Sequence, residues 1–121
     1  MHVTTDGAIA LQAAFGDATG IVLRAGTGSI AWARLPGGET ARVGGLGPAL
    51  GDHGSGYDLG RRALRAAGLA MEGMGRGTQL AARLTQHLHV SGLDELVRWA
   101  AGADVATVAA LAAEVLAAAT A

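Results

Sequence analysis

The sequence changes character near residue 55, and this change constrains the fold more than any other feature of the chain. Before it, glycines separate short runs rich in β-branched residues, and residues 20–25 have the length and composition of a buried strand. After it, alanine and leucine recur at helical spacing. This order predicts a single α/β domain, with a short mixed sheet containing an antiparallel hairpin and the site loops at residues 1–56, and a helical part at residues 57–121.

Turn and capping residues define the individual elements. Asp6 can cap a helix that runs to residue 15, because its carboxylate can accept from free N–H groups of the first turn, and residues 3–5 resemble the end of a strand. Residues 30–35 alternate as a strand does, and a Pro-Gly-Gly loop at 36–38 predicts a hairpin with a third strand at 40–43.

Four helices are expected in the second half. They cover residues 57–69 and 78–89, a segment after a capping box of Ser91 and Asp94, and a last helix capped by Asp104. The last helix would carry four apolar residues on one face: Val105, Val108, Leu111 and Val115.

Two missing residue types exclude several kinds of chemistry. The chain has no cysteine, which rules out disulfides, thiolate zinc sites and iron–sulfur ligands within these residues. All nine basic residues are arginine, so the lysine of a Walker-A phosphate loop is also missing. His87 and His89 would project from nearly opposite sides of a helix, so we expect no protein-held metal there.

Charge and hydropathy indicate a cytoplasmic protein. The formal net charge is −1 and the arginines are dispersed, so we expect no nucleic-acid partner. No apolar run approaches the ~20 residues that span a bilayer, and the first residues lack the pattern of a signal peptide, so we expect no membrane partner.

The segment Gly26-Thr27-Gly28-Ser29 is the most informative glycine motif. With the next two residues it fits the dinucleotide fingerprint G-x-G-x-x-A, but that fingerprint requires a helix directly after it, and a strand is expected here. A tight turn between strands suits another task. Its N–H groups and its two hydroxyls can approach a phosphate without obstruction by Cβ atoms.

Four motifs in register resemble the BadF/BadG/BcrA/BcrD-type ATPases, a family that includes N-acetylglucosamine and glucosamine kinases and has an actin-like (ribonuclease H-like) fold. The motifs are Thr4-Thr5-Asp6, Ala25-Gly26-Thr27-Gly28-Ser29, Gly44-Gly45-x-Gly47 and Leu50-Gly51-Asp52-x-Gly54-Ser55-Gly56. The resemblance is clear over residues 3 to about 70 and looser in the later helices.

The resemblance implies a kinase that phosphorylates an aminosugar with ATP and Mg²⁺. Asp6 matches the general base that acts on the sugar hydroxyl. Residues Gly26, Thr27, Gly28 and Ser29 match a loop facing the β- and γ-phosphates. Gly44, Gly45 and Gly47 match a turn that lines the sugar pocket, and Asp52 matches a carboxylate that accepts from sugar hydroxyls. Judged by local sequence alone, an alternative is that Asp6 is only a helix cap and Asp52 only a turn residue.

The chain also departs from the family pattern. Leu46 stands where a tryptophan or another bulky residue is usual, and His53 stands where glutamate is usual. By the family pattern, another phosphate loop would precede Met1 and an adenosine-binding motif would follow Ala121. We therefore expect the isolated chain to be incomplete as an enzyme and to bind ATP weakly.

Two other functions remain open from the sequence. One is the ATPase that activates an acyl-CoA dehydratase or reductase, although such ATPases hold an iron–sulfur cluster through cysteines. The other is a non-catalytic remnant or binding module. In each case we expect uncovered strand edges and apolar faces to drive homo-oligomerisation, or association with a lobe outside these residues.

Overall fold

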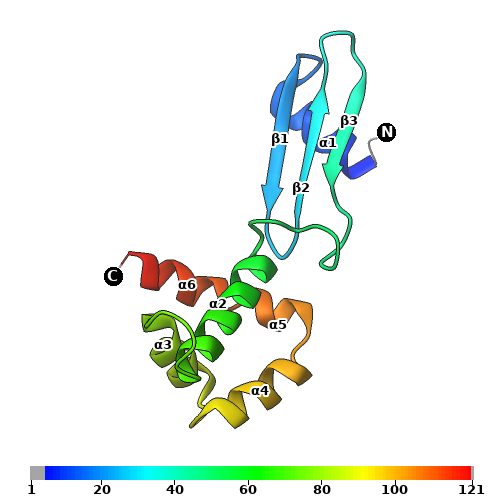
Figure 1. Ribbon diagram of the computed structural model, residues 1–121. Coiled ribbons are helices and arrows are strands. Elements are labelled where there is room, and N and C mark those ends of the chain that lie inside the picture. The colour runs from blue at the N-terminus through cyan, green and yellow to red at the C-terminus, as the bar shows by residue number, and fades with distance from the viewer. Residues whose placement is uncertain (1–4, 121) are drawn as a thin grey trace.

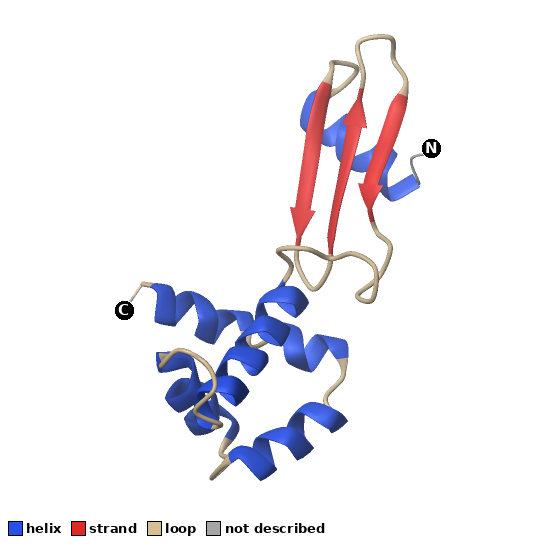
Figure 2. Ribbon diagram, in the orientation of Figure 1, coloured by secondary structure: helices blue, strands red, loops and turns tan. Residues whose placement is uncertain are grey.

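The computed structural model describes residues 5–120, with the strands at one end of the molecule and most of the helices at the other (Figures 1 and 2). The sheet end comprises α1 (Thr5–Phe15), β1 (Gly20–Ala25), β2 (Ser29–Arg34) and β3 (Thr40–Gly44). The helical end comprises α2 (Gly56–Met71), α3 (Gln79–Leu88), α4 (Leu93–Gly102), α5 (Val105–Ala109) and α6 (Ala112–Ala119). None of the described helices is both long and apolar enough to span a bilayer.

The three strands form an antiparallel sheet in the order β1-β2-β3. The expected hairpin is confirmed: the N–H of Leu35 donates to the carbonyl of Glu39 at 2.8 Å, and Gly38 takes a positive φ of 86° in the turn. Val22, Trp32 and Arg42 stand directly opposite one another across the three strands. Directly opposite residues share a face of the sheet, so this register fixes which side chains gather on each side.

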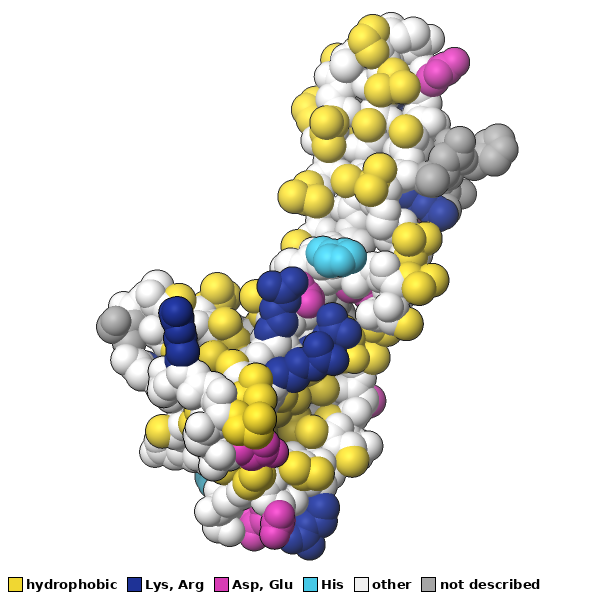
Figure 3. Space-filling view, viewed as in Figure 1, with side chains coloured by type: hydrophobic (Ala, Val, Ile, Leu, Met, Phe, Trp, Pro, Cys, Tyr) yellow, Lys and Arg dark blue, Asp and Glu magenta, His cyan; other side chains and the backbone are white. Residues whose placement is uncertain are grey.

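Helix α1 lies against one face of the sheet, and the other face is open (Figure 1). On the covered side Leu11 is fully buried and Trp32 is 5% exposed. On the open side Ile21, Leu23 and Val43 are largely exposed, and their apolar side chains spread over the sheet surface (Figure 3). The sheet end therefore has only half of the usual two-layer packing within the described residues.

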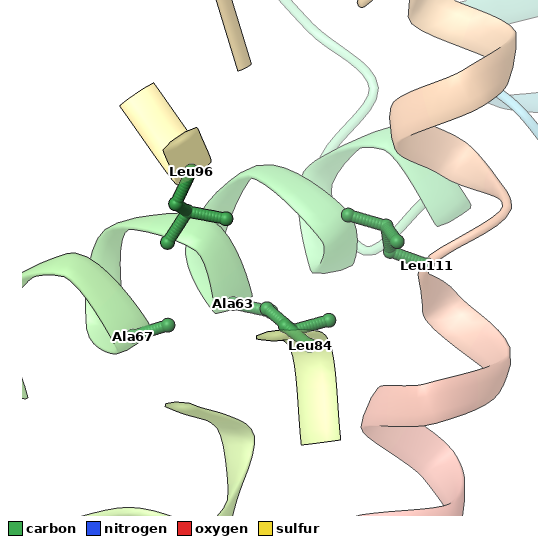
Figure 4. Packing of buried hydrophobic residues seen from close by; sticks show 5 residues of the cluster. All are labelled: Ala63, Ala67, Leu84, Leu96 and Leu111. Atoms are coloured by element: carbon green, nitrogen blue, oxygen red, sulfur yellow. The ribbon is translucent and has the colours of Figure 1, made fainter. Parts of the chain in front are cut away.

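The helical end has its own apolar core, built from small and medium side chains. Its buried members are Ala63, Ala67, Leu84, Leu96 and Leu111 (Figure 4). Trp99 packs against this cluster as a partly buried residue. The alanines of α2 let the neighbouring helices approach closely, and the leucines fill the space between them.

The structure corrects two of the expected helix boundaries. The helix expected from Val105 to Val115 is interrupted after Ala109, because the N–H of Leu111 bonds to the carbonyl three residues back and Leu111 turns into the core. The predicted capping box of Ser91 and Asp94 is also wrong, because Glu95 and not Asp94 accepts from both the N–H and the hydroxyl of Ser91. The expected strand end at residues 3–5 lies mostly outside the described residues, and Thr5 begins α1.

Candidate functional site

A pocket of about 430 Å³ lies where the β1–β2 turn, α1 and the loop before α2 meet. Most of the site residues expected from the sequence line it: Asp6, Gly26, Thr27, Gly28, Ser29, Gly45 and Asp52. Gly44 instead lines a second, more apolar pocket of about 490 Å³, which Ser29 and Asp52 share. Gly47 is among the lining residues of neither pocket.

The β1–β2 turn presents backbone donors to the first pocket. The N–H of Gly26 is used within the turn, donating to the carbonyl of Gly28 at 2.8 Å. Among the described residues no hydrogen bond engages the N–H groups of Thr27 and Gly28. Two neighbouring N–H groups of this kind, in a turn without large side chains, can donate to an anion such as a phosphate oxygen.

Asp52 braces this turn from the following loop. Its Oδ1 accepts from the N–H of Ser29 at 2.9 Å, and the residue is only 8% exposed. A Cβ on Gly28 would stand 2.6 Å from the same Oδ1, so the carboxylate can lie there only because residue 28 is glycine. Asp52 itself has a φ of +62°, a conformation that aspartate tolerates better than most residues.

The same turn is tied to the first residues of α2. The N–H of Gly56 donates to the carbonyl of Gly26 at 2.7 Å, and the N–H of Tyr57 donates to that of Thr27 at 3.3 Å. Ser55 caps the helix, accepting from the N–H of Asp58 at 3.1 Å. Because these groups already have partners inside the protein, the N-terminus of α2 supports the turn and is not itself the anion site.

Asp58 completes the support and was missed in the sequence analysis. Its buried carboxylate accepts from the N–H of Gly54 at 2.8 Å and lies within 3.5 Å of the guanidinium groups of Arg61 and Arg62. The bond from Gly54, with the two arginines, holds the pKa of Asp58 below its ordinary value, against the opposing effect of burial. The spacing of Ser55 and Asp58 is that of a capping box with aspartate in place of glutamate, and it could have revealed this residue.

Asp6 lies in the first turn of α1, with its side chain exposed at the pocket. A carboxylate at this position is favoured by the positive end of the helix dipole. It is therefore an accessible carboxyl group beside the turn donors. His53, in contrast, is an exposed residue of the second pocket, as expected for a loop histidine.

The glycines at the end of β3 and directly after it allow the chain to turn sharply toward Asp52. Gly44, Gly45 and Gly47 have φ values of 89°, 71° and 83°, in the region that side chains rarely adopt. A Cβ on Gly44 would stand 2.9 Å from the carbonyl oxygen of Ser29, so this residue also lets β3 pass close to the turn. Their common role in the described structure is to shape the backbone around the pocket.

Four further residues line the first pocket and were not expected there: Arg24, Ile30, Trp32 and Arg42. The alternation of β2 already predicts that Ile30 and Trp32 share a face. Extending this alternation across the sheet would have placed both arginines on the same side, since Arg24 stands opposite Ile30 and Arg42 opposite Trp32. The described residues contain no group of three or more acidic or histidine side chains that could hold a metal ion.

Comparisons with known proteins agree on one family. Over 97 residues the chain is 36% identical to N-acetylmuramic acid/N-acetylglucosamine kinase of Clostridium acetobutylicum, an alignment that covers 80% of this chain and 32% of that protein. It is 38% identical over 81 residues to N-acetyl-D-glucosamine kinase of Dictyostelium discoideum, covering 67% of this chain and 25% of that protein. The chain thus spans about a third or less of these relatives' length.

A solved structure extends the likeness to the fold. A candidate N-acetylglucosamine kinase from Chromobacterium violaceum superposes with a TM-score of 0.85 at 35% identity, covering 97% of this chain and 41% of that protein. This confirms the expected fold, in which the chain forms part of an actin-like ATPase. The model of the BadF/BadG/BcrA/BcrD ATPase family matches residues 1–121. The chain belongs to the BadF/BadG/BcrA/BcrD ATPase family.

Proposed function

We propose that this chain carries the sugar-binding and phosphate-binding part of an ATP-dependent aminosugar kinase. One observation carries the proposal: Asp6, the Gly26–Ser29 turn and Asp52 line the same pocket of about 430 Å³. This brings together an accessible carboxyl group, backbone donors without a partner among the described residues, and a second carboxyl group, as transfer of a phosphoryl group to a sugar hydroxyl requires. The named activities of the relatives support the same substrate class.

Each group has a distinct part in the reaction. Asp6 accepts the proton of the sugar hydroxyl while the oxygen of that hydroxyl bonds to the γ-phosphorus of ATP. The bond between the γ-phosphorus and the leaving ADP breaks in the same step. The N–H groups of Thr27 and Gly28 stabilise the charge on the phosphate oxygens. The free oxygen of Asp52 accepts from a sugar hydroxyl, while its other oxygen keeps Ser29 and the turn in place.

Mg²⁺ enters this proposal as the partner of ATP. Bound with ATP, it would neutralise charge on the phosphates. The turn residues 26–29 would fit a phosphate, because two of their N–H groups have no partner among the described residues and residues 26 and 28 have no Cβ. No ligand of Mg²⁺ is assigned among the described residues.

The test is sugar binding together with phosphoryl transfer from ATP over a panel of aminosugars. In any form of the protein that carries out the transfer, replacing Asp6 by Asn should lower transfer by more than about 10²-fold and leave sugar affinity nearly unchanged, because only the proton acceptor is lost. Asp17→Asn is the matched control, since Asp17 is an exposed residue beyond the end of α1 and outside the pocket. Turnover that survives Asp6→Asn would refute the assigned role, and a panel without any bound aminosugar would refute the function.

A further inference from the structure

Asp58 is a buried carboxylate that lies outside both pockets. It is 4% exposed and is among the lining residues of neither. A carboxylate that served only to cap a helix could remain in water, as Asp104 does at the start of α5, where it is exposed and accepts from the N–H of Thr107. Burial of a charged group is costly unless the group is paired and hydrogen-bonded, so the partners of Asp58 show which part of the chain it stabilises.

The two carboxylate oxygens of Asp58 contact different parts of the chain. Oδ1 faces Nη2 of Arg61 at 3.5 Å and Nε of Arg62 at 3.2 Å, both on its own helix. Oδ2 accepts from the N–H of Gly54 at 2.8 Å, in the loop before the helix. The arginines favour the charged form of the carboxylate, and a charged acceptor makes the stronger hydrogen bond to an amide. Both sets of contacts therefore stabilise the attachment of the loop to α2.

The loop that contains Gly54 has an uncommon backbone conformation. Asp52 and Gly54 both have a positive φ, of 62° and 73°. The N–H of Ser55 donates to the carbonyl of Asp52 at 3.1 Å, which closes residues 52–55 into one turn. An aspartate with a positive φ persists only where the surrounding structure holds it there. The bond from Gly54 to Asp58 provides such a contact, because it ties this turn to the first turn of α2.

The backbone of Asp52 determines where its carboxylate points. Oδ1 accepts from the N–H of Ser29 at 2.9 Å, and no hydrogen bond from a described residue engages Oδ2, although Asp52 lines the first pocket. A change of φ to a negative value would redirect the side chain of Asp52 relative to the preceding chain and withdraw both oxygens from these positions. The carboxylate in the pocket therefore depends on a bond that lies outside the pocket.

We propose that Asp58 is a positioning residue, which holds the carboxylate of Asp52 in the pocket through Gly54 and thereby sets the affinity for the aminosugar. This inference rests on the proposed kinase function and adds to it a residue that does not contact the substrate. The effect of Asp58 on binding passes through the loop at residues 52–55.

The first experiment needs no variant, because it follows two amides of the unmodified protein by hydrogen exchange. If opening of the loop breaks both bonds, the amides of Gly54 and Ser29 should have the same protection factor within about threefold. A difference of more than about tenfold in either direction would show that the two bonds open independently, and would overturn the inference.

The second experiment measures the affinity of Asp58→Asn for N-acetylglucosamine. The new amide has a single acceptor oxygen and turns an NH₂ group toward either Gly54 or the arginines. The affinity should fall about tenfold, since a hydrogen bond to a charged group is weakened, and the amide resonance of Ser29 should shift. Asp58→Glu, which keeps a carboxylate at the capping-box position, should restore most of the affinity. Asp104→Asn is the matched control, because it removes a helix-cap carboxylate outside both pockets and should change neither quantity.

The outcomes separate the inference from the function on which it rests. Unchanged affinity in a folded Asp58→Asn, or an equal loss in Asp104→Asn, would overturn the inference and leave the aminosugar kinase standing. If Asp58→Asn does not fold, the exchange of the two amides in the unmodified protein decides. Failure of the unmodified protein to bind any aminosugar would overturn the proposed function, while the two amides would still test whether Asp58 holds Asp52 in place.

Discussion

Adding a single methyl group to Gly28 tests how the candidate site is held together. The new Cβ would stand 2.6 Å from Oδ1 of Asp52 and 3.0 Å from its Cγ, closer than real Cβ atoms approach. Oδ1 is also the atom that accepts from the N–H of Ser29. In Gly28→Ala the carboxylate must therefore move, and the bond that braces the turn is lost.

The size of the effect follows from the groups involved. A hydrogen bond to a charged group contributes roughly 1.5–3 kcal/mol, and Asp52 is too buried for water to replace the bond fully. We expect Gly28→Ala to lower the free energy of unfolding by about this amount. Urea denaturation followed by circular dichroism measures it, and loss of protection of the Ser29 amide in hydrogen exchange shows its location.

Gly26→Ala is the matched control in the same turn. A Cβ at residue 26 meets nothing within 4 Å, and Gly26 does not have a positive φ. Its effect on stability should stay within about 0.5 kcal/mol, as for ordinary surface substitutions. If the two variants are equally stable, or if the Ser29 amide remains protected in Gly28→Ala, then Asp52 does not brace the turn.

Three more predictions concern stability and association. Gly60→Ala should destabilise the protein by about 1–3 kcal/mol, because its Cβ would overlap a carbonyl oxygen of α5. Gly68→Ala places its Cβ in open space and should stabilise α2 by about 0.5–1 kcal/mol. If urea denaturation shows that both variants are more stable than the unmodified protein, the close contact between Gly60 and α5 is contradicted. The pKa of Asp58 is lower in the folded protein than in the unfolded chain. Its contribution to the free energy of unfolding is therefore present above about pH 4 and is lost as the pH falls through the folded pKa. Thermal melts should show this loss, and Asp58→Asn should weaken that pH dependence. The exposed Leu23 and Val43 should cause self-association that threonine at both positions reduces; light scattering from a monodisperse 12.0 kDa species at high concentration would contradict this.

Local signals in the sequence predict much of the fold. The Pro-Gly-Gly loop marks the hairpin, and Asp104 caps α5 as expected, accepting from the N–H of Thr107 at 2.8 Å. The break between α5 and α6 could not be predicted in this way, because no glycine or proline marks it. It depends on the burial of Leu111 among side chains of other helices, which is a property of the packed core.

The candidate site also combines features that local sequence signals predict with features that depend on tertiary structure. The glycine motifs indicate Asp6, the turn at residues 26–29 and Asp52 through their resemblance to a family. The two pocket arginines belong to no such motif, and they line the same pocket only because the register of three strands places them on the face covered by α1. Register depends on pairing between segments distant in sequence, so single-strand patterns do not reveal the pair.

The two bonds between the β1–β2 turn and α2 have a mechanical consequence. Hydrogen bonds weaken steeply once they stretch, and the one from Tyr57 is already 3.3 Å long. A shift of the turn by one bond length, on the order of 1.5 Å, would break both bonds unless α2 moved with it. Since α2 carries Ala63 and Ala67 of the helical core, these two bonds couple the position of the turn to that of the core. We therefore expect a ligand bound at the turn to affect the orientation of the helical end as well.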